Sequence, residues 1–435
     1  MIFLTKHKET EIGKIPEDWE VKFLKDISDI LTGFPFKGEE YSLDEGILVV
    51  RGENLSYRKF RWDIPKRWRF LNDSVKKYLL KENLVVVSMD GNVGVNKAIT
   101  RKKDLPLLLA QRVAAIIAKK EECQDFINQV IMSDLFLKYC NQIKTGTTIN
   151  HISKVQIESF KIPYPNNIKE QKAIAKILSD LDSKIELNNQ MNATLEAMAQ
   201  AIFKHWFIDF EFPNENGKPY KSSGGKMVDS ELGKIPEGWK VEELGSSGSF
   251  KNGVNYIRGE SGNKEFYIVN VRDISNSRFL LKGGLDKVRL DAIKAKEYLL
   301  QESDIVIARS ACPGEISMMA NSIDNVIYSG FSIRYRLNTQ NNWLYMFLAL
   351  KSLKQRLSTY AVGTTLTSVN QESLKKLKYI LPPEGAIKKF NNTVEKSFEK
   401  LFVNLNESEI LSQTRDSLLP KLMSGKIRVQ MVVSK

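Results

Sequence analysis

The sequence contains an internal repeat with an offset of about 220 residues. Residues 11–24 (Glu-Ile-Gly-Lys-Ile-Pro-Glu-Asp-Trp-Glu-Val-Lys-Phe-Leu) return as residues 231–244, and nine of the fourteen positions are identical. Residues 76–82 match residues 296–302 at the same offset. Internal similarity of this kind marks separate copies of one structural unit. The chain is therefore expected to fold as two related halves.

Each half has the same order of expected elements. An apolar strand, at 84–88 or 305–308, leads into a turn with a matched glycine, Gly94 or Gly314. A helix follows, then a Gly-Thr-Thr segment, and then a strand end that contains proline. These three features are expected at 126–139, 146–148 and 162–165 in the first half, and at 343–353, 363–365 and 381–384 in the second.

A long helix is expected after each half. Residues 168–212 contain no Gly or Pro, and their apolar residues recur at sevens, which is typical of a coiled-coil seam. At 1.5 Å per residue, a helix from Lys169 to His205 would be roughly 55 Å long, too long to be buried in one domain. It therefore needs a partner helix, and the second stretch, at about 387–423, can pack against it antiparallel.

The expected seam is apolar with polar interruptions. Ile177, Met191 and Met198 run beside the first line of residues, Asn188 and Lys184 interrupt it, and Ser408 and Arg415 interrupt the second. A polar seam residue can fix register at a cost in stability. The seam residues are Ile174, Leu181, Leu195 and Ile202 in the first helix, and Phe398, Leu405 and Leu419 in the second.

The predicted fold is α+β, with two similar globular domains joined by two long antiparallel helices and related by pseudo-two-fold symmetry. Residues 213–230 are rich in Pro, Gly, Ser, Asn and Lys, which indicates a surface linker. The expected boundaries are a first domain at 1–166, a central helix at 167–212, the linker at 213–230, a second domain at 231–384, a C-terminal helix at 385–427 and a tail at 428–435.

Composition narrows the function classes only a little. The formal net charge of +13 raises the local concentration of polyanions, which makes nucleic acid a candidate partner. The three cysteines are scattered, which suits a reducing cytoplasm without structural disulfides. No run of about 18 apolar residues indicates a membrane span, and the first residues lack the core of a signal peptide. A cytoplasmic location is expected.

The first half contains a basic aromatic stretch at 58–69, with six cations, three aromatic residues and one acid. It could lie on a phosphate backbone, or it could be a solvated face with Trp62 and Trp68 half-buried in the core. The counterpart at 275–289 is also basic but built differently. The candidate DNA contacts from these stretches are Arg58, Lys59, Arg61, Trp62, Lys66, Arg67 and Arg69 in the first half, and Arg272, Arg278 and Arg289 in the second.

Loops after the apolar strands are further candidates. A protein that reads base edges in a DNA groove needs cations and amides, since arginine can pair with guanine and Asn or Gln with adenine. The Asp90-Gly91 pair could equally be a hairpin turn alone, and the Gly-Thr-Thr segments could be purely structural. The candidates from these loops and their surroundings are Asn92, Arg112, Lys144, Thr147, Thr148, Arg309, Ser310, Thr364 and Thr365.

Six large apolar residues lie within ten positions near the end of the first long helix, between Phe203 and Phe212. This exceeds what one partner helix covers, so a second docking surface is expected there. Burial against the neighbouring domain is the alternative. The residues predicted to bind a partner are Phe203, Trp206, Phe207, Phe210, Leu418 and Leu422.

Motifs for catalysis are missing from the sequence. No two glycines are two residues apart, which excludes GxG loops for phosphate, dinucleotide or S-adenosylmethionine. The sequence has no HExxH or Cys/His zinc spacing, and its three histidines are far apart in sequence. The chain is expected to bind without catalysing, and no metal site is expected.

Several motifs together resemble a known family. The openings Gly-Lys-Ile-Pro-Glu-x-Trp at 13–19 and 233–239, the central segment at 201–211 and the closing segment at 418–427 are similar to those of the DNA-specificity subunit of type I restriction-modification enzymes. The likeness covers essentially the whole chain. One departure is the turn at 311–314, which lacks the asparagine of the first half.

The resemblance implies that two target-recognition domains each read half of a bipartite DNA site. It also implies that the helices set the spacer and dock two methyltransferase subunits, and that a separate restriction subunit translocates and cleaves double-stranded DNA. S-adenosylmethionine, ATP and Mg would then be bound by the partner subunits and not by this chain. Two alternatives remain open at this point: a DNA methyltransferase or nuclease in its own right, and a non-specific coiled-coil scaffold.

Overall fold

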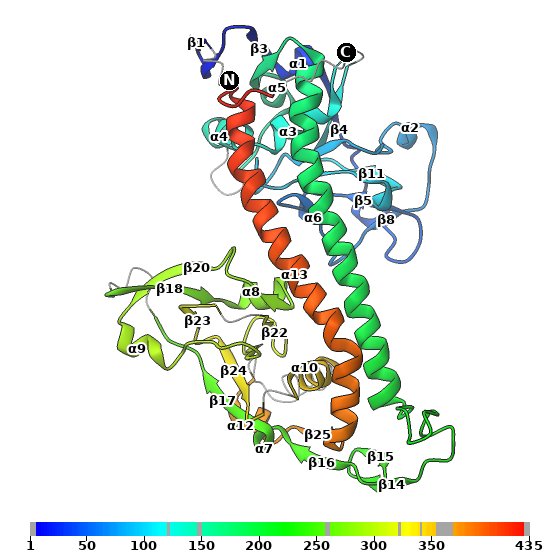
Figure 1. The fold of residues 1–435 in the computed structure, drawn as a ribbon. Coiled ribbons are helices and arrows are strands. Elements are labelled where there is room, and N and C mark those ends of the chain that lie inside the picture. The colour runs from blue at the N-terminus through cyan, green and yellow to red at the C-terminus, as the bar shows by residue number, and fades with distance from the viewer. Residues whose placement is uncertain are drawn as a thin grey trace, which may run out of the picture. The chain divides into compact units, whose positions relative to one another are not determined.

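The computed structural model describes residues 6–119, 122–145, 150–256, 262–320, 323–339, 342–353 and 369–429. The chain forms two compact units. Unit 1 comprises Met1–Ile185 and Ile410–Lys435, and unit 2 comprises Glu186–Glu409, so each long helix contributes one segment to each unit (Figure 1). The predicted α+β class with two long helices is confirmed.

Unit 1 is built on a four-stranded antiparallel sheet, in the order β10-β9-β12-β4, and a three-stranded sheet, in the order β11-β5-β8. The central strand β9 is buried on both faces: Val85 and Val87 contribute to one core cluster and Val86 to another. A strand covered on both faces needs a continuous apolar run, which is why this segment was recognisable in the sequence.

The elements of unit 1 up to the first long helix are β1 (His7–Thr10), β2 (Gly13–Pro16), β3 (Trp19–Phe23), α1 (Leu24–Ile27), β4 (Ser28–Thr32), η1 (Gly38–Glu40), β5 (Ile47–Val50), η2 (Gly52–Asn54), β6 (Leu55–Ser56), β7 (Lys59–Phe60), β8 (Arg67–Trp68), α2 (Asp73–Lys76), β9 (Val85–Ser88), β10 (Lys97–Ile99), η3 (Lys102–Asp104), β11 (Leu107–Leu109), β12 (Val113–Ala118), α3 (Gln124–Met132), α4 (Asp134–Ile143), α5 (Lys154–Glu158) and β13 (Lys161–Pro165). The long helix α6 (Ile168–Phe203) follows.

Unit 2 repeats this plan. A five-stranded sheet in the order β17-β24-β21-β22-β19 corresponds to the four-stranded one, and β20-β18-β23 corresponds to the three-stranded one. The central strand β21 again divides its side chains between two core clusters, with Ile305 and Ile307 in one and Val306 and Ala308 in the other.

The elements of unit 2 are η4, a short π-helix (Lys204–Ile208), β14 (Met227–Ser230), β15 (Gly233–Pro236), β16 (Lys240–Glu243), α7 (Leu244–Ser247), β17 (Gly248–Asn252), β18 (Lys264–Val269), α8 (Val271–Asn276), β19 (Phe279–Leu280), β20 (Asp286–Leu290), α9 (Ala292–Lys296), β21 (Ile305–Ala308), β22 (Ile316–Met319), β23 (Val326–Tyr328), β24 (Ser332–Leu337), α10 (Trp343–Ser352), α12 (Gln371–Lys375) and β25 (Lys378–Leu381). The long helix α13 (Glu384–Met423) follows.

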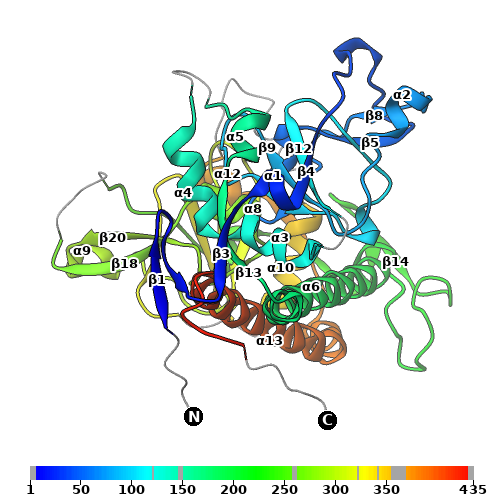
Figure 2. The same cartoon turned by 90° about the horizontal axis from the view of Figure 1, so that it is seen from above.

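In unit 1 the first part of α6 and the last part of α13 lie side by side and antiparallel (Figures 1 and 2). Ile174 of α6 shares a core cluster with Leu419 and Leu422 of α13. Further along the pair, Arg415 Nη1 lies 2.7 Å from Asp182 Oδ1. The helices therefore pack onto the core of unit 1 through apolar residues and onto each other through a buried ion pair.

In unit 2 the remaining segments of the same helices are also antiparallel. The rings of Phe203 and Phe390 lie 6.1 Å apart. Three buried asparagines form a polar layer: Asn188 Nδ2 donates to Asn404 O at 3.4 Å, and Asn404 Nδ2 donates to Asn192 Oδ1 at 2.9 Å. Buried amides that pair only in one alignment fix the register of the helices.

The expected helix seam differs from the structure at two positions. Ile177 and Met198, which were expected beside the seam, are exposed. Leu178, which the apolar pattern also places in the stripe, and Ala199, which it does not, are buried in their place. Of the seven predicted seam residues, three are buried (Ile174, Phe398 and Leu419) and four are half-buried (Leu181, Leu195, Ile202 and Leu405).

Two local expectations differ from the structure. The helix expected over 126–139 is two helices, because Ser133 Oγ donates to Val130 O at 2.6 Å and accepts from Leu135 N at 3.3 Å, which ends α3 and begins α4. The expected linker at 213–230 includes β14, which pairs with β15 as β1 pairs with β2. Of the described helices, none has both the length and the apolar character that a membrane span requires.

Candidate nucleic-acid interface

Three segments of unit 1 meet at one edge: the loop after β9, the turn between β11 and β12, and residues 150–152. Met89 N donates to Arg112 O at 2.9 Å, Ile152 N donates to Met89 O at 2.9 Å, and Gly91 N donates to Asn150 O at 2.9 Å. These backbone bonds bring together side chains that are far apart in sequence. We call this surface the unit 1 edge.

The corresponding segments of unit 2 meet through the same bonds. Arg309 N donates to Phe331 O at 2.9 Å, and Val369 N donates to Arg309 O at 3.0 Å. The loop after β21 and the turn between β23 and β24 therefore occupy the places of their unit 1 counterparts. We call this surface the unit 2 edge.

A fourth segment, which follows β4 in unit 1 and β17 in unit 2, is joined to both edges by the same backbone bond. Gln111 N donates to Phe34 O at 2.9 Å in unit 1, and Gly330 N donates to Val254 O at 2.9 Å in unit 2. The backbones approach so closely that a Cβ at Gly33 would lie 2.2 Å from the Ala110 backbone. A Cβ at the equivalent Gly253 would lie 2.1 Å from Ser329 O. The two edges thus have the same backbone arrangement, which we call the frame.

The unit 1 edge carries a charged cluster. Asp90 Oδ1 lies 2.5 Å from His151 Nδ1, and Asp90 Oδ2 lies 3.5 Å from Arg112 Nε. The Arg112 side chain is 56% exposed. A carboxylate that contacts the Nε side of a guanidinium restricts its orientation, while the exposed part can still form the forked pair that recognises guanine.

The unit 2 edge carries different side chains on the same frame. Ser310 stands where unit 1 has Asp90, and Phe331 stands where it has Arg112. Phe331 is 66% exposed. Asn255 is exposed beside it and reaches Gly330, where its Oδ1 would lie 2.1 Å from an added Cβ. Besides half-buried Arg309, this edge therefore offers an amide and an aromatic ring in place of the ionic cluster.

The basic stretch of unit 1 is partly accessible. Lys59, Arg61 and Arg69 are exposed, and Lys66 and Arg67 are half-buried. Trp68 is buried, and half-buried Trp62 stacks on Phe60 with 6.0 Å between ring centroids. The half-burial that the alternative of a solvated face expects is seen for Trp62 but not for Trp68, and the accessible cations remain candidate phosphate contacts.

Arg58, which was also a candidate DNA contact, is the exception, because it is the least accessible of these cations. Its side chain is only 11% exposed, and Nη1 lies 3.3 Å from Asp182 Oδ2 of α6. Asp182 also accepts the ion pair from Arg415 described above. Arg58 therefore attaches the basic stretch to the helix pair, and a phosphate could reach it only if this ion pair broke.

Lys97 of β10 is a buried cation that the sequence did not reveal. Its Nζ donates to Ile131 O at 2.9 Å and to Ser133 O at 3.4 Å, where α3 ends. Burial lowers the pKa of Lys97 to about 8, and the charge of Arg58 acts in the same direction. This lysine holds a helix end and does not face a ligand.

The basic candidates of unit 2 are exposed and hydrogen-bonded or ion-paired. Arg272 Nη2 lies 2.6 Å from Asp286 Oδ1, Arg278 pairs with Glu196 of α6, and Arg289 Nε donates to Gly262 O at 3.2 Å. The remaining candidates divide into exposed residues (Asn92 and Lys144), half-buried residues (Arg309 and Ser310) and residues outside the described part of the chain (Thr147, Thr148, Thr364 and Thr365).

The predicted docking residues near the end of α6 lie mostly in the core of unit 2. Phe207 packs 4.8 Å from the Tyr345 ring and 5.0 Å from the Phe390 ring, and Phe210 packs 5.6 Å from the Trp239 ring. Phe203 is also buried there. Their own unit covers most of each of these three side chains, and what stays open lines the groove described below.

The other three differ in burial. Trp206 is half-buried in unit 2, with its ring 5.9 Å from that of Phe390. In unit 1, Leu422 is buried in the core and Leu418 is half-buried against it. Leu422 is therefore covered by its own unit, whereas Trp206 and Leu418 keep some exposed surface.

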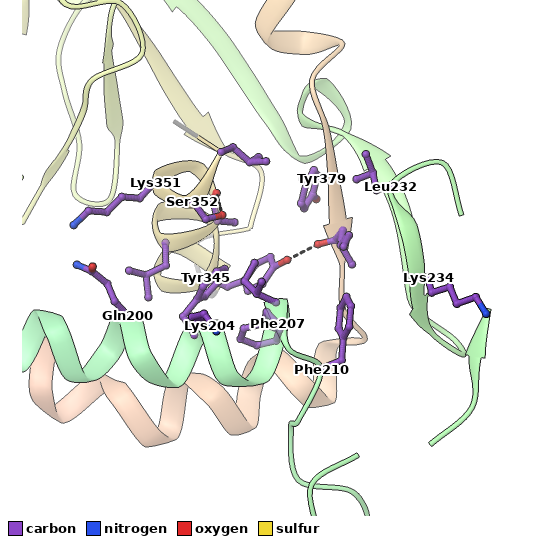
Figure 3. Close-up of a pocket in the computed structure, with 16 residues that line it drawn as sticks. Gln200, Lys204, Phe207, Phe210, Leu232, Lys234, Tyr345, Lys351, Ser352 and Tyr379 are labelled. Carbon is purple, nitrogen blue, oxygen red and sulfur yellow. Dashed lines mark hydrogen bonds between the residues drawn. The ribbon is translucent and has the colours of Figure 1, made fainter. Parts of the chain in front are cut away.

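A groove of about 860 Å³ remains beside the buried aromatic residues of unit 2 (Figure 3). Tyr345 forms one wall, and its hydroxyl donates to Ile380 O. Ile208 also lines the groove and is 49% exposed. The groove is lined by Gln200, Phe203, Lys204, Phe207, Ile208, Phe210, Leu232, Lys234, Tyr345, Leu348, Ala349, Lys351, Ser352, Leu353, Tyr379 and Ile380.

The described residues contain no group of three or more His, Cys, Asp or Glu side chains that could hold a metal ion. The fold and the edges thus define a tandem-repeat α+β protein with two matched loop surfaces that differ in side chains. The type I restriction modification DNA specificity domain model matches residues 16–197 and 236–412. The chain belongs to this family.

Relatives cover nearly the same length. The type I restriction enzyme MjaIX specificity subunit of Methanocaldococcus jannaschii is 27% identical over 439 residues, which cover 98% of this chain and 97% of the relative. The HindI specificity subunit of Haemophilus influenzae is 26% identical over 368 residues, which cover 70% of this chain and 77% of the relative. The crystal structure of a type I restriction-modification S subunit from M. genitalium has a similar fold, with a TM-score of 0.55 at 16% identity, over 95% of this chain and 97% of that one.

Proposed function

We propose that this chain is the DNA-reading specificity subunit of a type I restriction-modification complex, without catalytic activity of its own. Each unit reads one half of a bipartite site in double-stranded DNA. The observation that supports this most directly is the pair of edges, which share a backbone frame and differ in the side chains that could meet a base. Family membership and the basic excess agree with it.

The division of labour within each unit follows from the chemistry of its side chains. Exposed cations such as Arg61 and Arg69 would contact phosphates, which positions a protein on DNA without reading sequence. Arg112, held by Asp90, would pair with the O6 and N7 atoms of guanine in the major groove. We propose that the two long helices set the spacer between the half-sites.

The test uses the chain assembled with its methyltransferase subunits on a randomised duplex library. Selective enrichment of a bipartite sequence is the expected result. Replacing residues 26–160 by those of a relative with another target should change one half-site only. Changes in both half-sites, or in neither, would contradict the proposal that each unit reads one half-site.

A catalytic alternative is tested with the purified chain alone. Incubation with DNA and labelled S-adenosylmethionine should transfer no methyl group, because we propose that S-adenosylmethionine, ATP and Mg are bound by the methyltransferase and restriction subunits. Transfer by the isolated chain would support an enzyme in its own right.

We also propose that a methyltransferase subunit docks at the groove of unit 2, where Ile208 offers an apolar side chain. Ile208→Asp should weaken capture of that subunit at least tenfold, because an unpaired carboxylate is costly to bury. Met198→Asp is the matched control, since Met198 is 52% exposed on α6 and does not line the groove. Equal losses in both variants would exclude the groove as the docking site.

A further inference from the structure

The two edges differ most at one pair of equivalent positions. The carbonyl of Arg112 in unit 1 and that of Phe331 in unit 2 accept the same backbone bond, from Met89 N and Arg309 N respectively, each at 2.9 Å. We propose that Phe331 reads the unit 2 half-site by apolar contact with a base, at the position where unit 1 uses the guanidinium of Arg112. This rests on the proposed function and specifies the chemistry of one half of it.

Phe331 is held in place although its ring is exposed. Arg309 N donates to the carbonyl of Phe331. In addition, Gly330 N donates to Val254 O at 2.9 Å, and Ser332 Oγ donates to Ser329 O at 2.9 Å. The turn is therefore fixed on both sides of the residue. A ring on a fixed turn can be presented to a ligand with little loss of conformational freedom.

Exposure of this ring has no structural benefit within unit 2. Burying a phenylalanine side chain stabilises a protein, and Phe331 is 66% exposed and so forgoes most of that gain. It also lies next to polar groups suited to a base edge, since Asn255 and Ser310 flank it on the same frame. Isolated exposed apolar residues are common, but this one occupies the position of the unit 1 arginine.

The chemistry of the side chain limits what it can recognise. Phenylalanine neither donates nor accepts ordinary hydrogen bonds, so it cannot read a donor and acceptor pattern as Arg112 can. It can contact the methyl group of thymine in the major groove or stack on a base that has left the helix. The ligand is therefore a thymine or an unstacked base in the half-site of unit 2.

The experiment compares variants of the full chain, assembled with its methyltransferase subunits, on duplex libraries with one half-site randomised at a time. Phe331→Ala should lower binding of the preferred sequence about tenfold or more. The sequence preference should be lost only at one or two adjacent base pairs of a single half-site. Phe331→Leu should keep part of the preference if thymine methyl contact dominates. Ile293→Ala is the control, because Ile293 is 83% exposed in the same unit on α9, away from the edge.

A transplant sharpens the test. Because the backbones match, Ser310→Asp combined with Phe331→Arg should bring a guanine preference into the unit 2 half-site and leave the other half unchanged. An unchanged profile for Phe331→Ala, or an equal loss of binding to all sequences, would overturn the inference. Absence of any half-site preference in the unmutated complex would instead overturn the proposed function.

Discussion

The unit 1 edge and the unit 2 edge show how one backbone frame can carry two different sets of side chains. Both are closed by the same interloop hydrogen bonds, and both need a glycine where the loops touch, Gly33 or Gly253. Unit 1 places an ionic cluster on this frame, and unit 2 places an amide and an exposed ring there. Because the bonds of the frame join backbone atoms, these side chains can differ while the fold is kept.

The units also differ in how their basic segments are attached to the long helices. In unit 1, Arg58 and Arg415 share Asp182 in a largely buried site. In unit 2, Arg278 and Lys351 share Glu196, but the side chains of these two cations are 54% and 24% exposed. Two buried cations should depend far more on their shared carboxylate than two cations that water can still solvate.

The largest expected effect comes from removing that shared carboxylate. Asp182→Ala leaves two buried guanidinium groups without this partner, so it should destabilise unit 1 by about 3 kcal/mol or more. Glu196→Ala in unit 2 should cost clearly less. Hydrogen exchange of the full chain, followed separately in the two units, measures the stability loss of each variant. Equal losses would show that the two carboxylates do not differ in this way.

An intermediate effect is expected from Lys97, which stands in unit 1 at the sheet position that buried Ile316 occupies in unit 2. The folded-state pKa of Lys97 is about 8, below the unfolded value of about 10.4. Between these values the unfolded state binds more protons, so this group makes stability rise with pH through that window, and its contribution is lost as pH falls through 8.

Lys97→Met should remove this pH dependence. The stability difference between the variant and the original chain should change by about 3 kcal/mol between pH 7 and pH 10.5. Burial also raises the pKa of the neighbouring Cys140 thiol to about 12, which acts in the opposite direction; the charge of Lys97 lowers this pKa, so the variant keeps that opposing pH dependence. Parallel pH profiles of unfolding would show that the lysine charge is not penalised.

The smallest effect per residue is expected from the accessible arginines. Replacing Arg61, Arg67 and Arg69 by alanine should reduce the slope of log affinity against log salt by about 0.9 for each phosphate that is no longer neutralised. Arg58→Ala should leave the slope unchanged, since that side chain is buried against Asp182. A slope that responds to Arg58 but not to the other three would reverse the assignment of these cations.

Sequence patterns located the parts of the fold that depend on local periodicity. The strands β9 and β21, the two long helices and the matched glycine turns could all be placed, because burial on both faces or on one helical stripe leaves a repeating apolar pattern. The shift from Met198 to Ala199 was missed, since a seam assigned from sevens can be one residue off on a real helix turn.

The sites were less predictable. Asp90 and His151 are 61 residues apart and meet only because the loop after β9 hydrogen-bonds to residues 150–152. Phe331 was not a candidate at all, although its offset of 219 from Arg112 was a usable signal. Aromatic residues around Phe207 were assigned to a docking surface, because the sequence could not show that Tyr345 and Phe390 cover them.

The sequence alone determined that this protein is built from two copies of one unit with two long helices, because duplication and apolar periodicity are written locally in the chain. Tertiary structure decided which cations and aromatic rings remain accessible. Arg58 and Arg61 lie three positions apart in the same stretch, yet one is buried against a helix and the other is exposed. Burial and ion pairing depend on neighbours from distant segments, so only the folded chain separates a residue that holds the structure together from one that can meet DNA.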